Sequence, residues 1–286
     1  MVNKKYAAAA VVAAAAAVGG YVVIAAEGPV GDDVIAEQRA ALAAATDGAG
    51  FGPQSPRDLT SAAGANRRAF SVAPPVTQMT LCDIHFHENA EHRGGNFTTY
   101  AGNGDGKGYG TGFLYDGERA EAELAPLDAP IGESEHGDLV PGDTIEIHFV
   151  HSSADATLGK GLGTCLSEAT GNPQLRVETV VAVLVNDPAA ADFTEMAAIE
   201  EVDGLNQVPN LPADLGEPVV YTGSTTGPGY NLVASPFQVT WSVRPQVAKV
   251  DINSVGTWLS DNVFKEDHAH GVRNLVQNPD LLSEIN

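Results

Sequence analysis

The fold is decided by one segment, Cys82-Asp-Ile-His85-Phe-His87-Glu-Asn-Ala-Glu91-His92, in which polar and apolar residues alternate. Successive side chains of a β-strand point to opposite faces of the sheet, so His85 and His87 share one face and the apolar residues between them take the other. Two imidazoles held side by side in this way are good metal ligands. The segment therefore predicts a β-strand that carries two ligands of one metal ion.

A second alternating run, residues 144–152, contains Glu146 and His148 on the same face of a second predicted strand. If the two strands are neighbours, His148 joins His85 and His87 in a set of three imidazoles. Three histidines with an open fourth position are the ligand set of a catalytic zinc ion, which activates water. From its place on the strand, Glu146 would accept the free N–H of a ligand imidazole and fix its tautomer.

The remaining pattern is that of a β-protein. With 286 residues, 43% of them hydrophobic, the chain is long enough to bury a sizeable core. Strand-like runs recur at 176–185 and 237–243, whereas helix-like pieces are confined to 192–202 and the C-terminal end. We expect a mainly β fold with a few short helices, in which residues 51–286 form a single domain around a large, mostly antiparallel central sheet.

Two segments outside this pattern are less regular. Residues 27–50 are rich in alanine and predict either a tether or a short helix before the domain. Glycines crowd residues 93–117, which predicts a long irregular excursion without regular structure.

The acidic composition argues against two classes of binding partner. Asp and Glu number 37 against 15 Lys and Arg, a formal net charge of −22. So negative a chain is repelled by nucleic acid and by anionic lipid surfaces, and neither is expected as a partner. The sequence sets no oligomeric state.

The N-terminus has the features of an export segment. Lysines at positions 4 and 5 precede an apolar run from Tyr6 to Ala26. We interpret residues 1–26 as either a cleaved signal peptide or a membrane anchor, since about twenty helical residues just cross a bilayer. The protein is thus expected outside the cytoplasm, periplasmic or extracellular, with contact to a membrane only through this segment.

Two cysteines are present, Cys82 and Cys165. In an exported protein an even number of cysteines predicts a disulfide, and here only the pair Cys82–Cys165 is available. The alternative is two buried free thiols.

The metal-ligand motifs resemble those of a known enzyme family. His85-Phe-His87 with Glu91-His92, followed by Glu146-Ile-His148-Phe-Val150-His151, is similar to the metal-binding core of the alpha-class carbonic anhydrases. Further similar segments follow in the same chain order: Gln54-Ser-Pro56-Arg-Asp58-Leu, Tyr221-Thr-Gly223-Ser224-Thr225-Thr226-Gly-Pro228 and Val239-Thr-Trp241. Residues 82–95, with the glycine-rich insertion after them, are closer still to the delta-class carbonic anhydrases.

The resemblance implies a role for each matching residue. His85, His87 and His148 would bind zinc; whether Co2+ or Cd2+ replaces it is left open by the sequence. In this comparison Thr225 orients the attacking hydroxide and Thr226 neighbours the substrate. The carboxylate partner of Thr225 would be either Glu91 or, by its spacing, Glu135. Val150, Val181 and Trp241 would form an apolar pocket. For the proton shuttle, only His92 and His136 are candidates by residue type.

The function that follows is zinc-dependent, reversible hydration of carbon dioxide to bicarbonate and a proton by zinc-bound hydroxide. An alternative enzyme with the same ligands is a three-histidine zinc hydrolase, such as an esterase. A non-catalytic metal-binding β-protein is the alternative outside enzymes. The Gly-Ser-Thr-Thr segment at 223–226 favours the lyase, because an inert metal site has no need of a hydroxyl that orients hydroxide.

Overall fold

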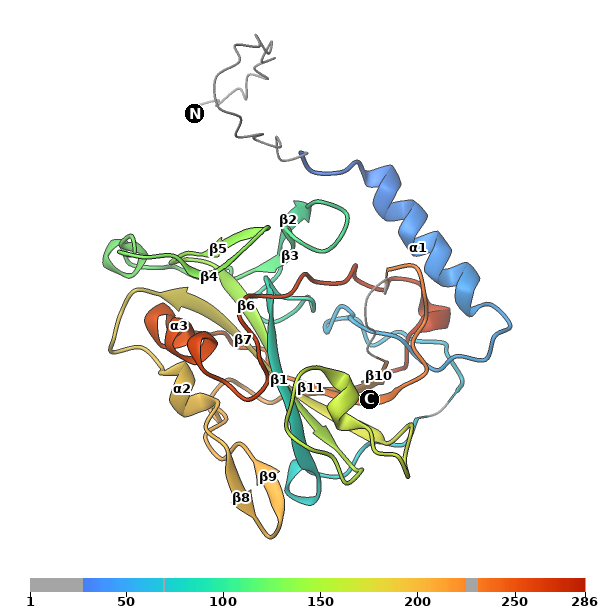
Figure 1. Cartoon of the computed structure of the whole chain (residues 1–286). Helices are drawn as coiled ribbons and strands as arrows, with labels where there is room; N and C mark the ends of the chain where they lie inside the picture. The colour runs from blue at the N-terminus through green and yellow to red at the C-terminus, as the bar shows by residue number, and fades with distance from the viewer. Residues whose placement is uncertain (1–27, 69, 225–230, 286) are drawn as a thin grey trace, which may run out of the picture.

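The computed structural model describes residues 28–68, 70–224 and 231–285 (Figure 1). The helices are α1 Asp32–Thr46, α2 Phe193–Met196 and α3 Ile252–Ser260, with short 3-10 turns η1 Val76–Gln78, η2 Glu121–Leu124, η3 Leu162–Cys165 and η4 Pro279–Leu281. The strands are β1 Thr80–Glu88, β2 Thr99–Asn103, β3 Thr111–Leu114, β4 Ile131–Ser134, β5 Gly137–Leu139, β6 Thr144–Ser152, β7 Gln174–Val185, β8 Glu200–Val202, β9 Leu205–Gln207, β10 Val219–Gly223, β11 Gln238–Val243 and β12 Ala248–Asp251.

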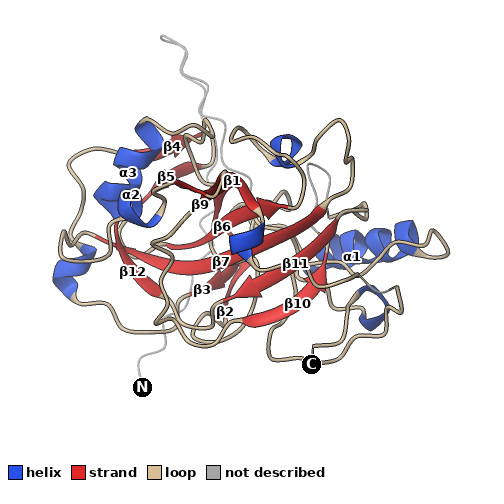
Figure 2. Ribbon diagram, turned by 90° about the horizontal axis from the view of Figure 1, so that it is seen from below, coloured by secondary structure: helices blue, strands red, loops and turns tan. Residues whose placement is uncertain are grey.

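A six-stranded central sheet runs through the molecule in the order β1–β6–β7–β11–β10, and β12 pairs with the far half of β7 (Figure 2). The pairs β1/β6, β6/β7 and β10/β11 are antiparallel, whereas β7 runs parallel to both β11 and β12. The fold is therefore mainly β as predicted, around a mixed sheet in which antiparallel pairings are the majority. Figure 2 shows α2 and α3 at one end of the molecule and α1 at the other.

The two faces of the sheet have different neighbours. One face presents the apolar residues Phe86, Ile147 and Leu184 to α2 and α3, where they form the larger hydrophobic core. The opposite face carries a second apolar cluster that includes Val150 and Trp241. Since β6 is buried along its whole length, its polar residues on this second face lie inside the protein.

Strand register brings the two sequence motifs together. His85 of β1 lies directly across from His148 of β6, and His87 lies across from Glu146. Directly opposed residues of an antiparallel pair share a face, so these four side chains converge on the second face of the sheet. Alternation along each strand only permitted these side chains to meet, and the register of the β1/β6 pair brings them together.

Two expectations about local structure need correction. The glycine-rich stretch 93–117 is not wholly irregular, because it contains the antiparallel pair β2 and β3. Tyr100 lies across from Phe113 there, and this aromatic contact supports the pairing. The helix-like piece at 192–202 is reduced to the single turn α2, which Asp192 caps by accepting from two backbone N–H groups.

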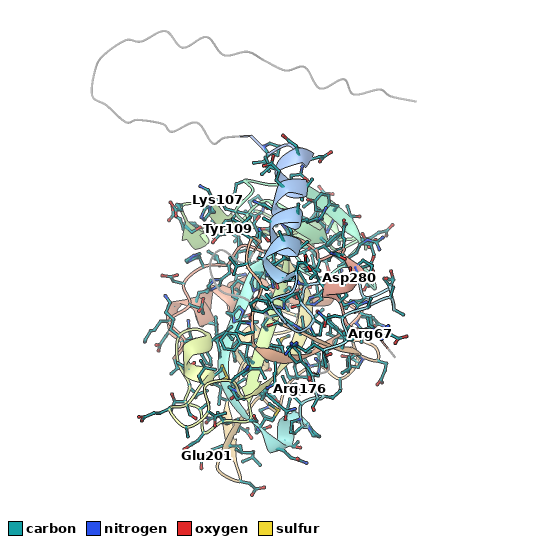
Figure 3. All side chains as sticks on the ribbon, turned by 90° about the vertical axis from the view of Figure 1, so that its right-hand side faces the viewer. Arg67, Lys107, Tyr109, Arg176, Glu201 and Asp280 are labelled. Carbon is teal, nitrogen blue, oxygen red and sulfur yellow. A yellow bond between two sulfur atoms is a disulfide. The ribbon has the colours of Figure 1, made fainter. Side chains whose placement is uncertain are left out.

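Residues 32–46, left open between tether and helix, form α1, which lies against the rest of the protein. Ile35 and Leu42 of α1 are buried. Gln38 Nε2 donates to the carbonyl oxygen of Gly106 at 2.8 Å, which joins α1 to the glycine-rich insertion. Figure 3 shows Lys107 and Tyr109 of this insertion near α1. Among the described residues, none of the helices has the length and apolar character needed to cross a membrane.

Cys82 and Cys165 form a disulfide, which connects the start of β1 to η3. Gly159 N and Thr164 Oγ1 both donate to the carbonyl oxygen of Cys82, at 3.3 and 3.2 Å. The loop before η3 is thereby held against β1 close to the first metal-ligand candidate.

Candidate metal centre

Three imidazoles gather on the second face of the sheet. One ring nitrogen from each of His85, His87 and His148 lies within 4.8 Å of the other two. Nε2 of His85 and Nδ1 of His148 are only 3.2 Å apart. The first two rings are partly accessible and the third is buried.

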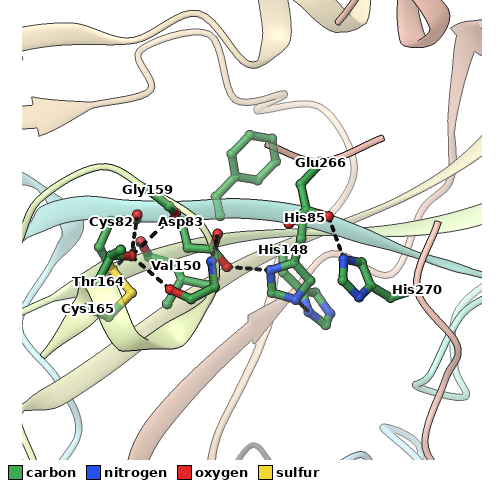
Figure 4. Close-up of polar contacts among 12 residues, drawn as sticks. Cys82, Asp83, His85, His148, Val150, Gly159, Thr164, Cys165, Glu266 and His270 are labelled. Atoms are coloured by element: carbon green, nitrogen blue, oxygen red, sulfur yellow. Dashed lines mark hydrogen bonds and ion pairs between the residues drawn. A yellow bond between two sulfur atoms is a disulfide. The ribbon is translucent and has the colours of Figure 1, made fainter. Parts of the chain in front are cut away.

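Each of these rings has its other nitrogen next to a protein acceptor. His85 Nδ1 lies 2.7 Å from Asp83 Oδ2, His87 Nδ1 lies 2.9 Å from the Gly271 carbonyl, and His148 Nε2 lies 2.8 Å from Glu146 Oε1. An acceptor fixes the proton on the nitrogen that faces it. The nitrogens left with a free lone pair are therefore Nε2 of the first two rings and Nδ1 of the third. Figure 4 shows Asp83 beside His85, and His85 next to His148.

A divalent metal fits these donors. Lone pairs of His85 and His148 that face each other at 3.2 Å repel unless a cation lies between them. Tetrahedral zinc with Zn–N distances of about 2.0–2.1 Å places two ligand nitrogens about 3.3–3.4 Å apart. The separation of this pair is close to that value, and the third ring nitrogen lies within 4.8 Å of both, so the donor set fits a divalent metal such as zinc.

Electrostatics keep two of the three imidazoles neutral. Burial, followed by the neighbouring imidazoles, holds the pKa of His87 well below its usual value. Burial lowers the pKa of His148 to about 4, although Glu146 opposes the shift. For His85, burial also disfavours the charge, but the carboxylate of Asp83 outweighs it and the pKa is raised. A neutral ring is the form that binds a metal.

Behind His148 lies a chain of buried polar groups. Glu146 Oε1 accepts from His92 Nδ1 at 2.6 Å as well as from His148, and His92 Nε2 lies 2.6 Å from the hydroxyl of Tyr221. Both ring nitrogens of His92 are thus engaged, and its side chain is fully buried. A shuttle must exchange protons with solvent, so this geometry argues against His92 in that role and assigns it to the support of Glu146.

The two carboxylates considered as partners of Thr225 lie in different surroundings. Glu91 is buried, accepts from the backbone N–H of Arg273 at 2.9 Å, and has Oε1 3.8 Å from His87 Nδ1. Burial, reinforced by the nearby Glu146, raises the pKa of Glu91 to about 7. Glu135 is 89% exposed in the β4–β5 turn. The position of Glu91 therefore favours it over Glu135.

The predicted apolar pocket residues lie on the same face as the imidazoles. Val150, Val181 and Trp241 are buried members of one hydrophobic cluster. The Trp241 ring centroid is 5.0 Å from that of His148. Thr225 and Thr226 fall outside the described residues, which stop at Ser224 and resume at Asn231.

A further histidine that the strand motifs do not reveal lies beside the cluster. The His270 ring centroid is 5.6 Å from that of His85 and 5.9 Å from that of His87. Its Nε2 is 2.5 Å from Glu266 Oε2 (Figure 4). In contrast, the proposed shuttle His136 stacks on Tyr109, and within the described part of the chain it contacts none of the three ligand imidazoles.

The sequence analysis also missed the roles of three groups: Asp83 and the carbonyl of Gly271, which contact His85 and His87, and Tyr221, which contacts His92. Only the first carried a signal, since Asp83 lies two residues before His85 and so on the same strand face. The other two come from distant segments that strand periodicity does not connect.

Three neutral or carboxylate-supported imidazoles on the face of a mixed β-sheet are the kind of site that metal-dependent, water-activating enzymes use. The family model of the delta carbonic anhydrases matches residues 76–254, which include all three imidazoles. The chain belongs to the delta carbonic anhydrase family and is a carbonic anhydrase. No curated protein sequence matches it significantly.

Several carbonic anhydrases are among the solved structures to which the chain is similar. The alpha-carbonic anhydrase of Thermovibrio ammonificans, in complex with sulfanilamide, has 18% identity, 78% coverage of this chain, 84% coverage of its own and a TM-score of 0.26. The Photobacterium profundum alpha-carbonic anhydrase has 16% identity, 86% coverage of this chain, 95% coverage of its own and a TM-score of 0.27. A halotolerant carbonic anhydrase of Dunaliella salina has 17% identity, 80% coverage of this chain, 85% coverage of its own and a TM-score of 0.33. Structural similarities with TM-scores this low carry no argument, and the family assignment rests on the match of the sequence to the family model.

Proposed function

We propose that this carbonic anhydrase uses zinc, held by His85, His87 and His148, to hydrate carbon dioxide reversibly to bicarbonate and a proton. The observation that carries the proposal is the convergence of the three ring nitrogens within 4.8 Å, each ring oriented by an acceptor on its other nitrogen. Zinc, when bound, lowers the pKa of water beside it to about 7 and so makes hydroxide available at neutral pH.

The surrounding residues have two tasks in this proposal. Asp83, Glu146 and the Gly271 carbonyl hold the imidazoles in one tautomer, so that the ligand set needs little reorganisation. Val150 and Trp241 supply an apolar wall next to the cluster, which suits a small nonpolar substrate and excludes bulk water.

We assign orientation of the attacking oxygen to Thr225, with Glu91 as its carboxylate partner. Support for Glu91 comes from its burial and from its place beside His87. Thr226 keeps its proposed position next to the substrate.

We further propose that the enzyme works outside the cytoplasm, in the periplasm or the extracellular space. The Cys82–Cys165 disulfide supports this location, because disulfides persist in oxidising compartments. The apolar run at 6–26 supports export as well.

The test is stopped-flow hydration of carbon dioxide by the purified protein, with its metal content measured on the same sample. We expect about one zinc per chain, and loss of both metal and activity in His148→Ala. His136→Ala is the matched control for metal content, since it removes an imidazole outside the cluster and should retain the zinc. Full activity in a metal-free preparation, or an unchanged metal content in His148→Ala, would overturn the proposal.

A further inference from the structure

Helix α1 carries a cation within its buried stripe. Ile35, Arg39 and Leu42 are spaced i, i+4 and i+7, which places them on one face of the helix. Ile35 and Leu42 are 4% and 5% exposed, so this face packs against the rest of the protein. Arg39 is half-buried among them, and burial lowers the pKa of its guanidinium. A charge that loses water in this way needs a counter-charge.

The protein itself supplies little compensation. In the part of the chain that the structure describes, Arg39 makes one hydrogen bond, from Nε to the carbonyl oxygen of Leu275 at 3.3 Å, and no ion pair. Its two terminal nitrogens therefore have no acceptor among these residues. They are the part of the guanidinium fork that binds carboxylate or phosphate oxygens.

Arg39 borders a cavity of about 430 Å³ between α1, the β2–β3 pair and residues 273–277. Two more arginines line it, Arg93 and Arg273, against only two carboxylates, Asp32 and Asp58. Three of the nine arginines of a chain with net charge −22 thus meet at one cavity.

The two carboxylates of this cavity already have donors. Asp58 Oδ2 accepts from Arg93 Nη1 at 2.7 Å, and Asp32 Oδ1 accepts from Asn103 Nδ2 at 2.8 Å. Asp58 is thus paired with Arg93 and Asp32 is held by a neutral amide, and neither forms an ion pair with Arg39 in the described part of the chain. Neutral hydrogen-bonding side chains, Asn274 and Gln277 among them, complete the wall.

We propose that this cavity binds a small oxyanion, with Arg39 as its principal ligand. Bicarbonate and inorganic phosphate share the chemistry that the site recognises: a negative charge and several acceptor oxygens for a guanidinium fork. The site is separate from the metal centre, since it lies between α1 and the body of the protein and its lining contains none of the three ligand imidazoles.

The cavity is linked to the metal centre by one short segment. The carbonyl of Gly271 accepts from His87, and the backbone N–H of Arg273 donates to Glu91. The same segment supplies the carbonyl that Arg39 contacts. An anion that draws Arg39 into the cavity therefore acts on the segment that positions His87. This coupling rests on the proposed function, whereas the binding of the anion does not.

The test uses the full-length metal-loaded protein and compares the rise in melting temperature caused by sodium phosphate or sodium bicarbonate with that caused by sodium chloride at equal ionic strength. Arg39→Gln removes the proposed ligand, and Arg67→Gln removes an exposed guanidinium as the matched control (Figure 3). We expect phosphate to stabilise the wild type and Arg67→Gln equally, and the apparent Kd to rise about tenfold or more in Arg39→Gln. Arg39→Lys, which keeps the charge, should recover part of the affinity.

The two anions separate the sources of the ligand. If bicarbonate acts at lower concentration than phosphate, the cavity is a product-sensing site; the reverse order makes it a phosphate site. The proposal is overturned if neither oxyanion exceeds chloride in the wild type, or if Arg39→Gln responds as Arg67→Gln does. Because no turnover is measured, a failure of carbon dioxide hydration leaves this result intact.

Discussion

Nε2 of His85 and Nδ1 of His148 face each other at 3.2 Å across the β1/β6 pair, while the opposite nitrogens of both rings face carboxylates. Residues that are direct partners in an antiparallel pair have their side chains about 5 Å apart at Cβ, so the register alone brings two imidazoles to one ion. The carboxylates behind them, Asp83 and Glu146, then decide which nitrogen is presented.

Glu146→Gln should weaken metal binding by about 10- to 100-fold, because the amide replaces the carboxylate that holds His148 in its ligand tautomer. Competition with a chelator measures this affinity. Glu178→Gln is the control, since Glu178 is a buried carboxylate on β7 that pairs with Arg176 and Arg244 away from the imidazoles. Equal affinities in the two variants would contradict the role given to Glu146.

Asp83→Asn should also lower metal affinity, by about tenfold. The Asp83 carboxylate orients the His85 ring, and its charge holds the ring proton on Nδ1, so that Nε2 is free to bind the metal. Thermal unfolding with and without added zinc is the measurement. We expect the zinc-induced rise in melting temperature to shrink in Asp83→Asn. If that rise is as large as in the wild type, the hydrogen bond of Asp83 does not tune the site.

Glu91→Gln and Glu135→Gln distinguish the two carboxylates proposed for Thr225. Glu91 is buried beside the cluster and Glu135 is exposed, so only the first substitution should reduce kcat, by about 10- to 100-fold if an oriented group is lost. Stopped-flow assays at matched metal content give the comparison. A larger loss in Glu135→Gln would reverse the assignment.

His151 predicts a pH dependence of stability. Its imidazole is fully buried, and burial lowers its pKa from 6.5 to about 4. Between these values the unfolded chain binds the proton and the folded protein does not, so the free energy of unfolding falls as the pH drops. The loss approaches about 3 kcal/mol at pH 4 for this one group.

His151→Leu should remove this contribution to the acid sensitivity. Nε2 of His151 has no hydrogen-bond partner in the described part of the chain, so at pH 7 the substitution loses only the bond from Nδ1 to the Phe149 carbonyl, about 1 kcal/mol. Urea unfolding at pH 7 and at pH 4.5 then gives a smaller difference for the variant than for the wild type. Identical differences would show that His151 is not the titrating group.

Replacement of both Cys82 and Cys165 by serine should reduce the free energy of unfolding by about 2–5 kcal/mol, because the disulfide closes a loop with a sequence separation of 83. The same loop donates from Gly161 N to Asp83 Oδ1 at 3.3 Å, and Asp83 orients His85, so metal affinity should fall as well. Denaturant midpoints and chelator competition report the two effects. Unchanged midpoints would contradict the stabilising role.

Much of the centre was readable from the sequence because strand alternation is a local property. On a strand His85 and His87 must share a face wherever that strand lies in the sheet, and the same holds for Glu146 and His148. The strands at 144–152 and 174–185 and the Cys82–Cys165 pair agree with the pattern of the chain.

Other features depended on contacts between distant segments, which no local period encodes. Tertiary packing placed the Gly271 carbonyl against His87 and the Tyr221 hydroxyl against His92. The same packing buried Glu91 and left Glu135 exposed. It also brought Arg39 of α1 to the same cavity as Arg93 and Arg273. The sequence by itself determined which side chains can bind a metal, because parity along a strand fixes the face each residue takes. The tertiary structure decided which groups orient them, since those hydrogen bonds join residues that only the folded chain brings together.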